Sequence, residues 1–140
     1  MLETYAQWLA TLVGALSGLP AEARQLIGTG FVLNFEAECT AAAVSAAVAA
    51  TAGAMTPASL GHRLATGLVV AAAMQIANIA RLLAIALAGE YLGAAALQPM
   101  HDWLAPAAMA AATIAAWTLW WRVMSNRYDV KSHIAGTDAR

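Results

Sequence analysis

The sequence predicts an all-α integral membrane protein, a bundle of three to four transmembrane helices with a short extended segment before the helix that opens at its cysteine. Of the 140 residues, 61% are hydrophobic and only 11% are charged, whereas about a quarter of the residues in a soluble domain are charged. The mean hydropathy is +0.65. Apolar runs that approach the roughly 20 residues of a membrane span recur along the chain.

Cys39 is the single cysteine of the chain, and this count excludes several kinds of thiol chemistry. One cysteine makes no internal disulfide, no CxxC pair and no thiolate metal cage, which excludes a short helical disulfide oxidase. We expect no cofactor, no metal and no nucleic-acid partner, because the chain has no glycine-rich phosphate loop and no recognised zinc spacing around Cys39 and His101. The N-terminus lacks a basic region and a clear cleavage site, so we do not expect a removable signal peptide.

One membrane domain is expected over residues 1–140, beginning with a short helix over residues 1–20. Large apolar residues recur at helical spacing on one face of Tyr5–Leu19 and polar residues occupy the other, so this segment is either a short span or an interfacial helix. An outer connector over residues 21–38 follows. Within it, Phe31–Phe35 is expected to be extended after two glycines.

A three-helix core is expected over residues 39–121. Its apolar runs cover residues 40–55, 64–80 and 103–121. Breaks that contain Pro57 and Pro99 separate these runs, and a polar tail over residues 122–140 follows them. In the first run, small residues repeat every four positions, at Ala41, Ser45, Ala49 and Gly53. Such a face lets helix backbones approach closely in lipid, although simple alanine bias would give the same pattern.

The basic residues are distributed unequally. If the helices alternate across the membrane, five of the seven fall on one side, namely Arg63, Arg122, Arg127, Lys131 and Arg140. Positive residues in short loops stay on the cytoplasmic side, so we predict a multi-pass protein of the plasma (inner) membrane with a cytoplasmic C-terminus. Cys39, Arg81 and His101 then all lie at the extracytoplasmic ends of helices, where they can meet in one shallow pocket.

Cys39 is expected at a helix N-terminus. The helix dipole and the free N–H groups there favour thiolate, the reactive form of cysteine. Arg81 would add positive charge, whereas Glu36 and Glu38 oppose it unless they pair with the arginine. The alternative is that Cys39 is a small buried apolar residue, the usual fate of free cysteine.

Arg81 belongs to a polar stripe in which Gln75, Asn78 and Arg81 follow at spacing three, on one helix face. In lipid such a stripe is expected to face other helices or a wet cavity. The guanidinium can hold a peptide carbonyl or stabilise an oxyanion, with Asn78 and Gln75 in support. Alternatively Arg81 simply extends to the headgroups.

His101 is the candidate acid and base. It can take a proton from a thiol and later protonate a leaving amine. Its neighbour Asp102 is a candidate cap for the helix that begins at Trp103. The alternative is an ordinary interfacial histidine. We interpret His62 and His133 as loop and tail residues.

Three pieces of this chain resemble the exosortase/archaeosortase family of membrane cysteine transpeptidases. They are EAEC at residues 36–39, NIAR at residues 78–81, and His101 at the opening of the next helix. The resemblance covers roughly residues 30–121 and implies that Cys39 is the nucleophile, Arg81 the oxyanion or carbonyl partner, and His101 the acid and base. The chain departs from the family pattern at Thr40-Ala41, where Ser-Gly is common, and at Ala105, where glycine is common, and it is shorter than most members.

The resemblance implies a membrane-embedded cysteine peptidase or transpeptidase that cleaves a C-terminal sorting signal through a thioester. Its partner would be an exported protein that carries a tripartite signal: a short motif, a transmembrane helix and a basic cluster. Two other functions remain open on the residues alone. One is a noncatalytic membrane assembly partner, and the other is a transporter subunit in which the Gln75–Asn78–Arg81 stripe lines an anion path. The sequence does not indicate an oligomeric state.

Overall fold

Long helices and one small sheet at one end of the molecule make up the fold, in a computed structural model that describes residues 1–57 and 59–137. Within these ranges, the side chains at positions 38, 105 and 123–137 fall outside the description. The four principal helices are α1 (Leu2–Ser17), α2 (Ala42–Met55), α3 (Leu60–Leu92) and α5 (Ala105–Thr137). Short helical pieces connect them: η1 (Ala37–Thr40), η2 (Ala94–Ala96), α4 (Leu97–Pro99) and η3 (Met100–Leu104).

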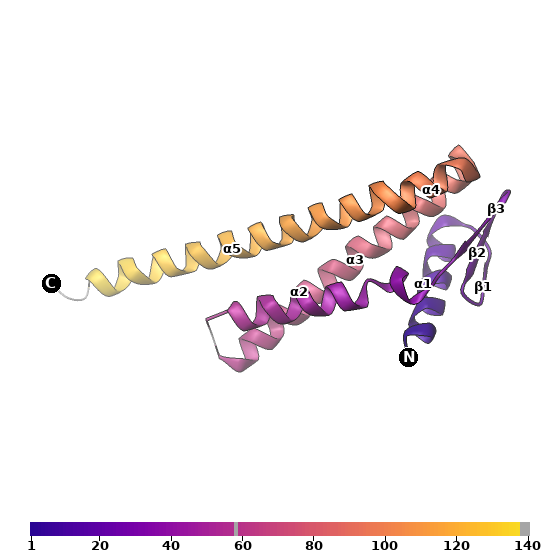
Figure 1. Cartoon of the computed structure of the whole chain (residues 1–140). Helices are drawn as coiled ribbons and strands as arrows, with labels where there is room; N and C mark the ends of the chain where they lie inside the picture. The colour runs from indigo at the N-terminus through magenta and orange to yellow at the C-terminus, as the bar shows by residue number, and fades with distance from the viewer. Residues whose placement is uncertain (58, 138–140) are drawn as a thin grey trace.

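Helix α3 packs against each of the other three principal helices. Figure 1 shows α2 beside its first half, α1 and the sheet beside its second half, and α5 folding back from its C-terminal end. Two helical stretches, Leu60–Leu92 and Ala94–Arg122, are long and apolar enough to cross a membrane, and α2 is a shorter apolar helix. The mostly helical architecture expected from the sequence is therefore confirmed, and the two long apolar helices are consistent with the expected membrane location.

The connector between α1 and α2 is more ordered than the sequence predicted. Instead of one extended stretch, it holds an antiparallel sheet of β1 (Ala21–Glu22), β2 (Gln25–Gly28) and β3 (Phe31–Asn34), in that order. The expected stretch is β3. Glycine at position 30 permits the tight turn between β2 and β3, because its φ of 89° lies in the left-handed region.

Helix α3 continues beyond Ala80, the end that the apolar run predicts. Residues 82–88 are leucine, alanine and isoleucine, which continue a helix after Arg81 without a break. The helix ends only at Gly93, whose φ is 84° and whose N–H donates to the Gly89 carbonyl at 3.1 Å. Helix α5 likewise continues past position 121, to Thr137. Arg81 is therefore inside a long helix and not near its exit.

The small-residue face of α2 packs against α3, as its spacing predicted. A Cβ atom placed on Gly53 would lie 2.9 Å from the Arg63 carbonyl oxygen, and one on Gly67 would lie 3.2 Å from the Ala49 carbonyl oxygen. The two backbones therefore approach so closely that a larger residue at position 53 does not fit. Dispersion between close backbones is the packing force available to helices in lipid.

A hydrophobic core forms where α1 and the sheet meet the second half of α3. Its buried members include Leu9 and Val13 of α1, Leu26 of β2, and Leu82 of α3. Phe35 and Cys39 join the same cluster from the segment that follows β3. The sheet is thus fixed to α3 by burial, and it carries the cysteine segment with it.

Candidate functional site

Cys39 lies in a tight turn and not at the first residue of a helix. It belongs to η1, and its N–H donates to the Glu36 carbonyl at 3.0 Å. Thr40 closes the turn, because its hydroxyl donates to the Ala37 carbonyl at 2.6 Å. Helix α2 begins at Ala42, after Ala41 with a φ of 49°. The expected position at the helix N-terminus is therefore corrected by about one helical turn.

The thiol is buried but in contact with a backbone acceptor. Cys39 is 9% exposed, and its Sγ lies 3.9 Å from the carbonyl oxygen of Asn34 at the end of β3. A sulfhydryl is a weak donor, so this contact orients the sulfur without holding it strongly. The sulfur consequently lies at the point where the strand ends.

Asn78 ties this turn to α3. Its side chain is 0% exposed, and its Nδ2 donates to the Cys39 carbonyl at 2.8 Å. The Oδ1 atom of the same side chain is buried and has no partner among the described residues. An unpaired buried polar atom lowers the stability of a fold and is therefore rare. Here it belongs to the side chain that holds the cysteine turn.

Arg81 follows Asn78 by three residues, on the same face of α3 and about 4.5 Å further along the axis. Its Nε is buried and unpaired, and no hydrogen bond or ion pair with a described residue engages its guanidinium. Two groups on one face of α3 therefore lack a partner among the described residues: the amide oxygen of Asn78, which contacts the cysteine turn, and the guanidinium of Arg81, one turn further along.

Gln75, the third member of the stripe, has a structural task. Its Oε1 accepts from the Tyr5 hydroxyl of α1 at 2.8 Å, and its Nε2 donates to the Ser45 hydroxyl of α2 at 2.9 Å. This relay joins three helices immediately below the cysteine turn. Gln75 thus supports the site by fixing its walls.

His101 is not brought to the cysteine. It lies in η3, its side chain is 52% exposed, and its Nδ1 is 3.2 Å from the Asp102 carboxylate. Leu97, just before it, packs at Gly89 of α3, which is 11 residues beyond Asn78 and hence about 16 Å along the axis. Figure 1 shows the start of α5 and the start of α2 at separate places along α3.

Glu38 was expected to flank the nucleophile, but its side chain lies outside the described part of the structure. His133 lies outside it as well. Within the described part, no group of three or more His, Cys, Asp or Glu residues is arranged to hold a metal ion.

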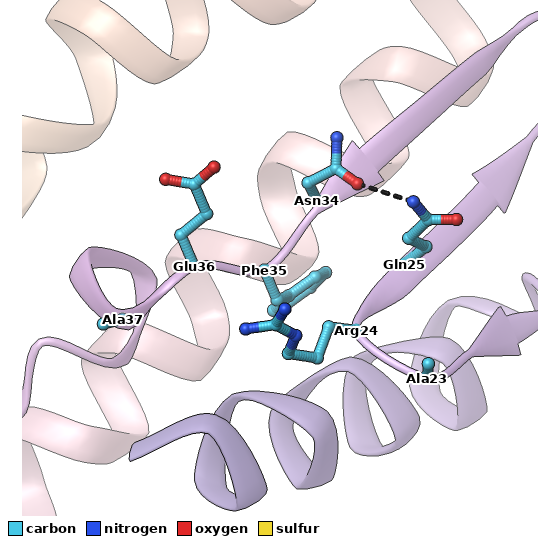
Figure 2. Close-up of a pocket in the computed structure, with 7 residues that line it drawn as sticks. All are labelled: Ala23, Arg24, Gln25, Asn34, Phe35, Glu36 and Ala37. Carbon is cyan, nitrogen blue, oxygen red and sulfur yellow. Dashed lines mark hydrogen bonds between the residues drawn. The ribbon is translucent and has the colours of Figure 1, made fainter.

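A cleft of about 480 Å³ opens next to the cysteine turn. Figure 2 shows its walls: the start of β2, the end of β3 and the segment that leads into η1. Gln25 Nε2 donates to Asn34 Oδ1 at 2.9 Å on one side, and the Arg24 side chain extends across the opening toward the Glu36–Ala37 segment. The cleft thus combines one basic, one acidic and two amide side chains around the buried ring of Phe35.

Two features of the site were missed from the sequence. One is the β2–β3 hairpin that forms the cleft, although the two-residue Thr29-Gly30 turn between apolar segments is a recognisable hairpin signal. The other is its attachment to α3: Glu90 accepts from the Thr29 N–H at 2.9 Å and from the Thr29 hydroxyl at 2.7 Å. No local sequence signal predicts that second contact.

No protein-family model, no curated protein and no solved structure matches this chain.

Proposed function

We propose that this protein is a membrane-embedded cysteine peptidase or transpeptidase of the exosortase type, which cleaves a C-terminal sorting signal of exported proteins through a thioester. The observation that carries the proposal is the arrangement on α3. Fully buried Asn78 holds the Cys39 carbonyl, and one turn further along, Arg81 presents a guanidinium with no partner among the described residues. Carbonyl attack by a thiol requires a donor for the negative charge that develops on the oxygen, and an uncommitted guanidinium on the helix that holds the cysteine turn can supply it.

In the proposed reaction, the Cys39 sulfur attacks the carbonyl carbon of the scissile peptide. The C–N bond breaks, the C-terminal piece leaves as an amine that takes up a proton, and the N-terminal piece remains as a thioester on Cys39. Water or an acceptor amine then attacks that thioester and restores the thiol. Arg81 donates to the carbonyl oxygen as negative charge develops there, an interaction often worth about 3 kcal/mol per donor.

The length of α3 is consistent with a site at the membrane boundary. Its 33 residues span about 50 Å, while the hydrocarbon core is about 30 Å thick. If the core begins just after Arg63, about 20 residues bring it to the vicinity of Leu83. Arg81 and the cysteine turn then lie at the outer boundary, and the β2–β3 hairpin lies beyond it.

A groove between α2 and α3 suits the helical part of such a substrate. Its volume is about 440 Å³, and its lining is almost entirely small or aliphatic, including the exposed residues Ala50, Ala54, Leu64 and Leu68. Small residues at a lipid-exposed surface let a second helix approach closely. We propose that the transmembrane helix of the substrate packs along this side, which presents its outer end to Cys39.

His101 enters the proposal as an acid and base that reaches the site after substrate binds. Catalytic hydrogen bonds are often unformed without substrate, and η3 is an irregular π-helical turn whose histidine is half exposed. Its approach to Cys39 requires displacement of the segment around Leu97–Leu104. A variant at His101 that processes substrate at the normal rate would remove it from the mechanism and leave Cys39 and Arg81 in place.

The burial of Cys39 within an apolar cluster favours one competing function, a noncatalytic assembly partner with an inert thiol. The transporter alternative has less support, because the amide nitrogens of Gln75 and Asn78 both donate to protein acceptors and are not free to line an anion path.

The test compares C-termini of exported proteins in cells that carry the wild-type chain, Cys39→Ala or Arg81→Lys. We expect proteins with a C-terminal signal helix to lose it in wild-type cells and to retain it with Cys39→Ala. Arg81→Lys keeps the charge but loses the planar fork that holds a carbonyl, so we expect a large loss of processing.

Arg122→Lys is the matched control, since that arginine lies beyond the last apolar run. It should process normally. Equal amounts of all variants in the membrane fraction are required for the comparison. Normal processing by Cys39→Ala would overturn the peptidase and favour the assembly partner.

A further inference from the structure

The open edge of strand β3 leads directly to the cysteine. In the described part of the chain β3 has one neighbour, β2, so its other edge is unpaired. The register fixes which backbone groups face that edge. Gly28 pairs with Phe31 across the two-residue turn, Leu26 pairs with Leu33, and the Phe35 N–H donates to the Arg24 carbonyl at 2.7 Å.

Because backbone groups alternate along an antiparallel strand, the intervening residues Val32 and Asn34 direct their N–H and C=O groups away from β2. Val32 is 52% exposed, and Asn34 is exposed too. Of these four groups, the Asn34 carbonyl oxygen contacts the Cys39 sulfur at a distance of 3.9 Å. The sulfur therefore lies on the open side of the strand, and the Val32 N–H, the Val32 C=O and the Asn34 N–H have no hydrogen-bond partner among the described residues.

Building on the proposed function, we propose that the substrate binds as an additional strand along this edge. Its scissile carbonyl then accepts a hydrogen bond from the Asn34 N–H, next to Cys39. An exposed strand edge gives affinity to any extended peptide through main-chain hydrogen bonds.

The structure also gives the direction of the added strand. The hairpin tip is bound to α3 at Glu90 and the cysteine turn at Asn78, a separation of about 18 Å along α3. Strand β3 therefore runs from the outer end of α3 down to the thiol. A substrate with its folded part outside and its helix in the membrane runs the same way, so the pairing is parallel.

Parallel pairing specifies each hydrogen bond. We number the substrate residues back from the scissile bond, the first residue carrying the scissile carbonyl. The first residue donates its N–H to the Val32 carbonyl and accepts from the Asn34 N–H. The third residue accepts from the Val32 N–H at its carbonyl. The N–H of the second residue points away from β3 and is not used.

The edge is held rigid before a peptide arrives. The Thr29 N–H and hydroxyl fix the hairpin tip to Glu90 at 2.9 and 2.7 Å, and the Phe31 ring packs within 3.0 Å of a Cβ placed on Gly89. A preorganised edge lowers the entropy that binding costs.

The test uses alkylation of Cys39, the sole cysteine, in the purified protein in detergent micelles. The probe is acetyl-Ala-Ala-Ala chloromethyl ketone, which the sulfur attacks at the methylene carbon with loss of chloride and a proton. Two analogues carry an N-methyl group on the first or the second residue from the ketone. Iodoacetamide, which has no peptide to pair, reports intrinsic access to the thiol.

We expect methylation of the first residue to slow alkylation roughly three- to tenfold, the value of one hydrogen bond, and methylation of the second to change it less than about twofold. Val32→Pro removes a free N–H at an edge position that tolerates proline, so it should slow the parent probe by a similar factor and leave iodoacetamide unaffected. Val32→Thr, the matched control, keeps the N–H and should react like wild type.

Each other result overturns a specific claim. Equal effects of the two methyl groups, a larger effect at the second residue, or an unchanged rate for Val32→Pro would overturn the strand pairing while Cys39 remains a reactive nucleophile. Failure of iodoacetamide and of every peptide probe to alkylate Cys39 would overturn the proposed function, and the pairing with it.

Discussion

Replacing Asn78 with leucine tests how the cysteine turn is held. Asn78 is completely buried and donates the one side-chain hydrogen bond that α3 gives to the Cys39 carbonyl among the described residues. Leucine has the same branched shape and the same number of heavy atoms as asparagine, so the change removes the donor without opening a cavity. The turn keeps its bond from the Cys39 N–H to the Glu36 carbonyl but loses its link to the helix.

The magnitude follows from what the substitution leaves unpaired. A buried carbonyl without a donor costs about 1–3 kcal/mol. Loss of the unpaired Oδ1 atom of Asn78 offsets part of that cost, because this atom no longer has to be kept from water. We therefore expect the turn to open more easily by about 1–2 kcal/mol, which corresponds to a 5- to 30-fold larger open population.

The assay is the rate of Cys39 alkylation by iodoacetamide, since a buried thiol reacts from the open turn. Asn78→Leu should react roughly 5–30 times faster than wild type. Gln75→Leu is the matched control on the same face. It loses the bonds with Tyr5 and Ser45 but leaves the Cys39 carbonyl paired, so its rate should rise less than about threefold.

An unchanged or slower rate in Asn78→Leu would refute this reasoning, because the turn would then not depend on the Asn78 bond. A rate in Gln75→Leu equal to that of Asn78→Leu would refute it in another way. Both substitutions would then loosen the junction of the helices as a whole, and the Asn78 hydrogen bond would not be what holds the cysteine turn closed.

Two further substitutions test how the scaffold positions the site. Glu90→Gln weakens the charge-assisted bonds from Thr29, so the Thr29 amide hydrogen should exchange faster; unchanged exchange would show that the hairpin tip does not need this tie. Gly53→Leu forces a side chain against the Arg63 carbonyl oxygen, which lies 2.9 Å from the added Cβ. The substitution should lower the stability of the fold by about 1–3 kcal/mol, and hence lower the midpoint temperature of thermal aggregation. Gly61→Ala, which meets nothing within 4 Å, should keep the wild-type midpoint, and equal midpoints for both variants would contradict the α2–α3 packing.

The predictable parts of the fold are those that depend on local pattern. Small residues at every fourth position of α2 indicated its contact face, because spacing alone places Ser45 and Gly53 on one side of a helix. Strand β3 was visible from its position after two glycines. The end of α3 differs from the prediction because arginine is a good helix former and does not end a helix, and α3 ends only before Gly93, whose φ is positive.

The candidate site was predictable only in part, for a related reason. Spacing placed Asn78 and Arg81 on one face of α3, and the structure puts the cysteine turn against that face. Proximity between Cys39 and His101, in contrast, was inferred from both lying at outer helix ends. That inference assumed helices of one membrane span each, whereas α3 has 33 residues, more than a single span needs. The extra length separates His101 from the thiol in the structure.

The central claim, that Cys39 carries an acyl intermediate, is tested most directly by isolating that intermediate. The protein is recovered from cells under denaturing, thiol-free conditions at acidic pH and analysed by mass spectrometry before and after neutral hydroxylamine. We predict a covalent polypeptide adduct on Cys39 that hydroxylamine releases and that is absent from Cys39→Ala. A wild-type protein that carries no adduct, in cells whose exported proteins are nevertheless trimmed at the C-terminus even with Cys39→Ala, would contradict the account.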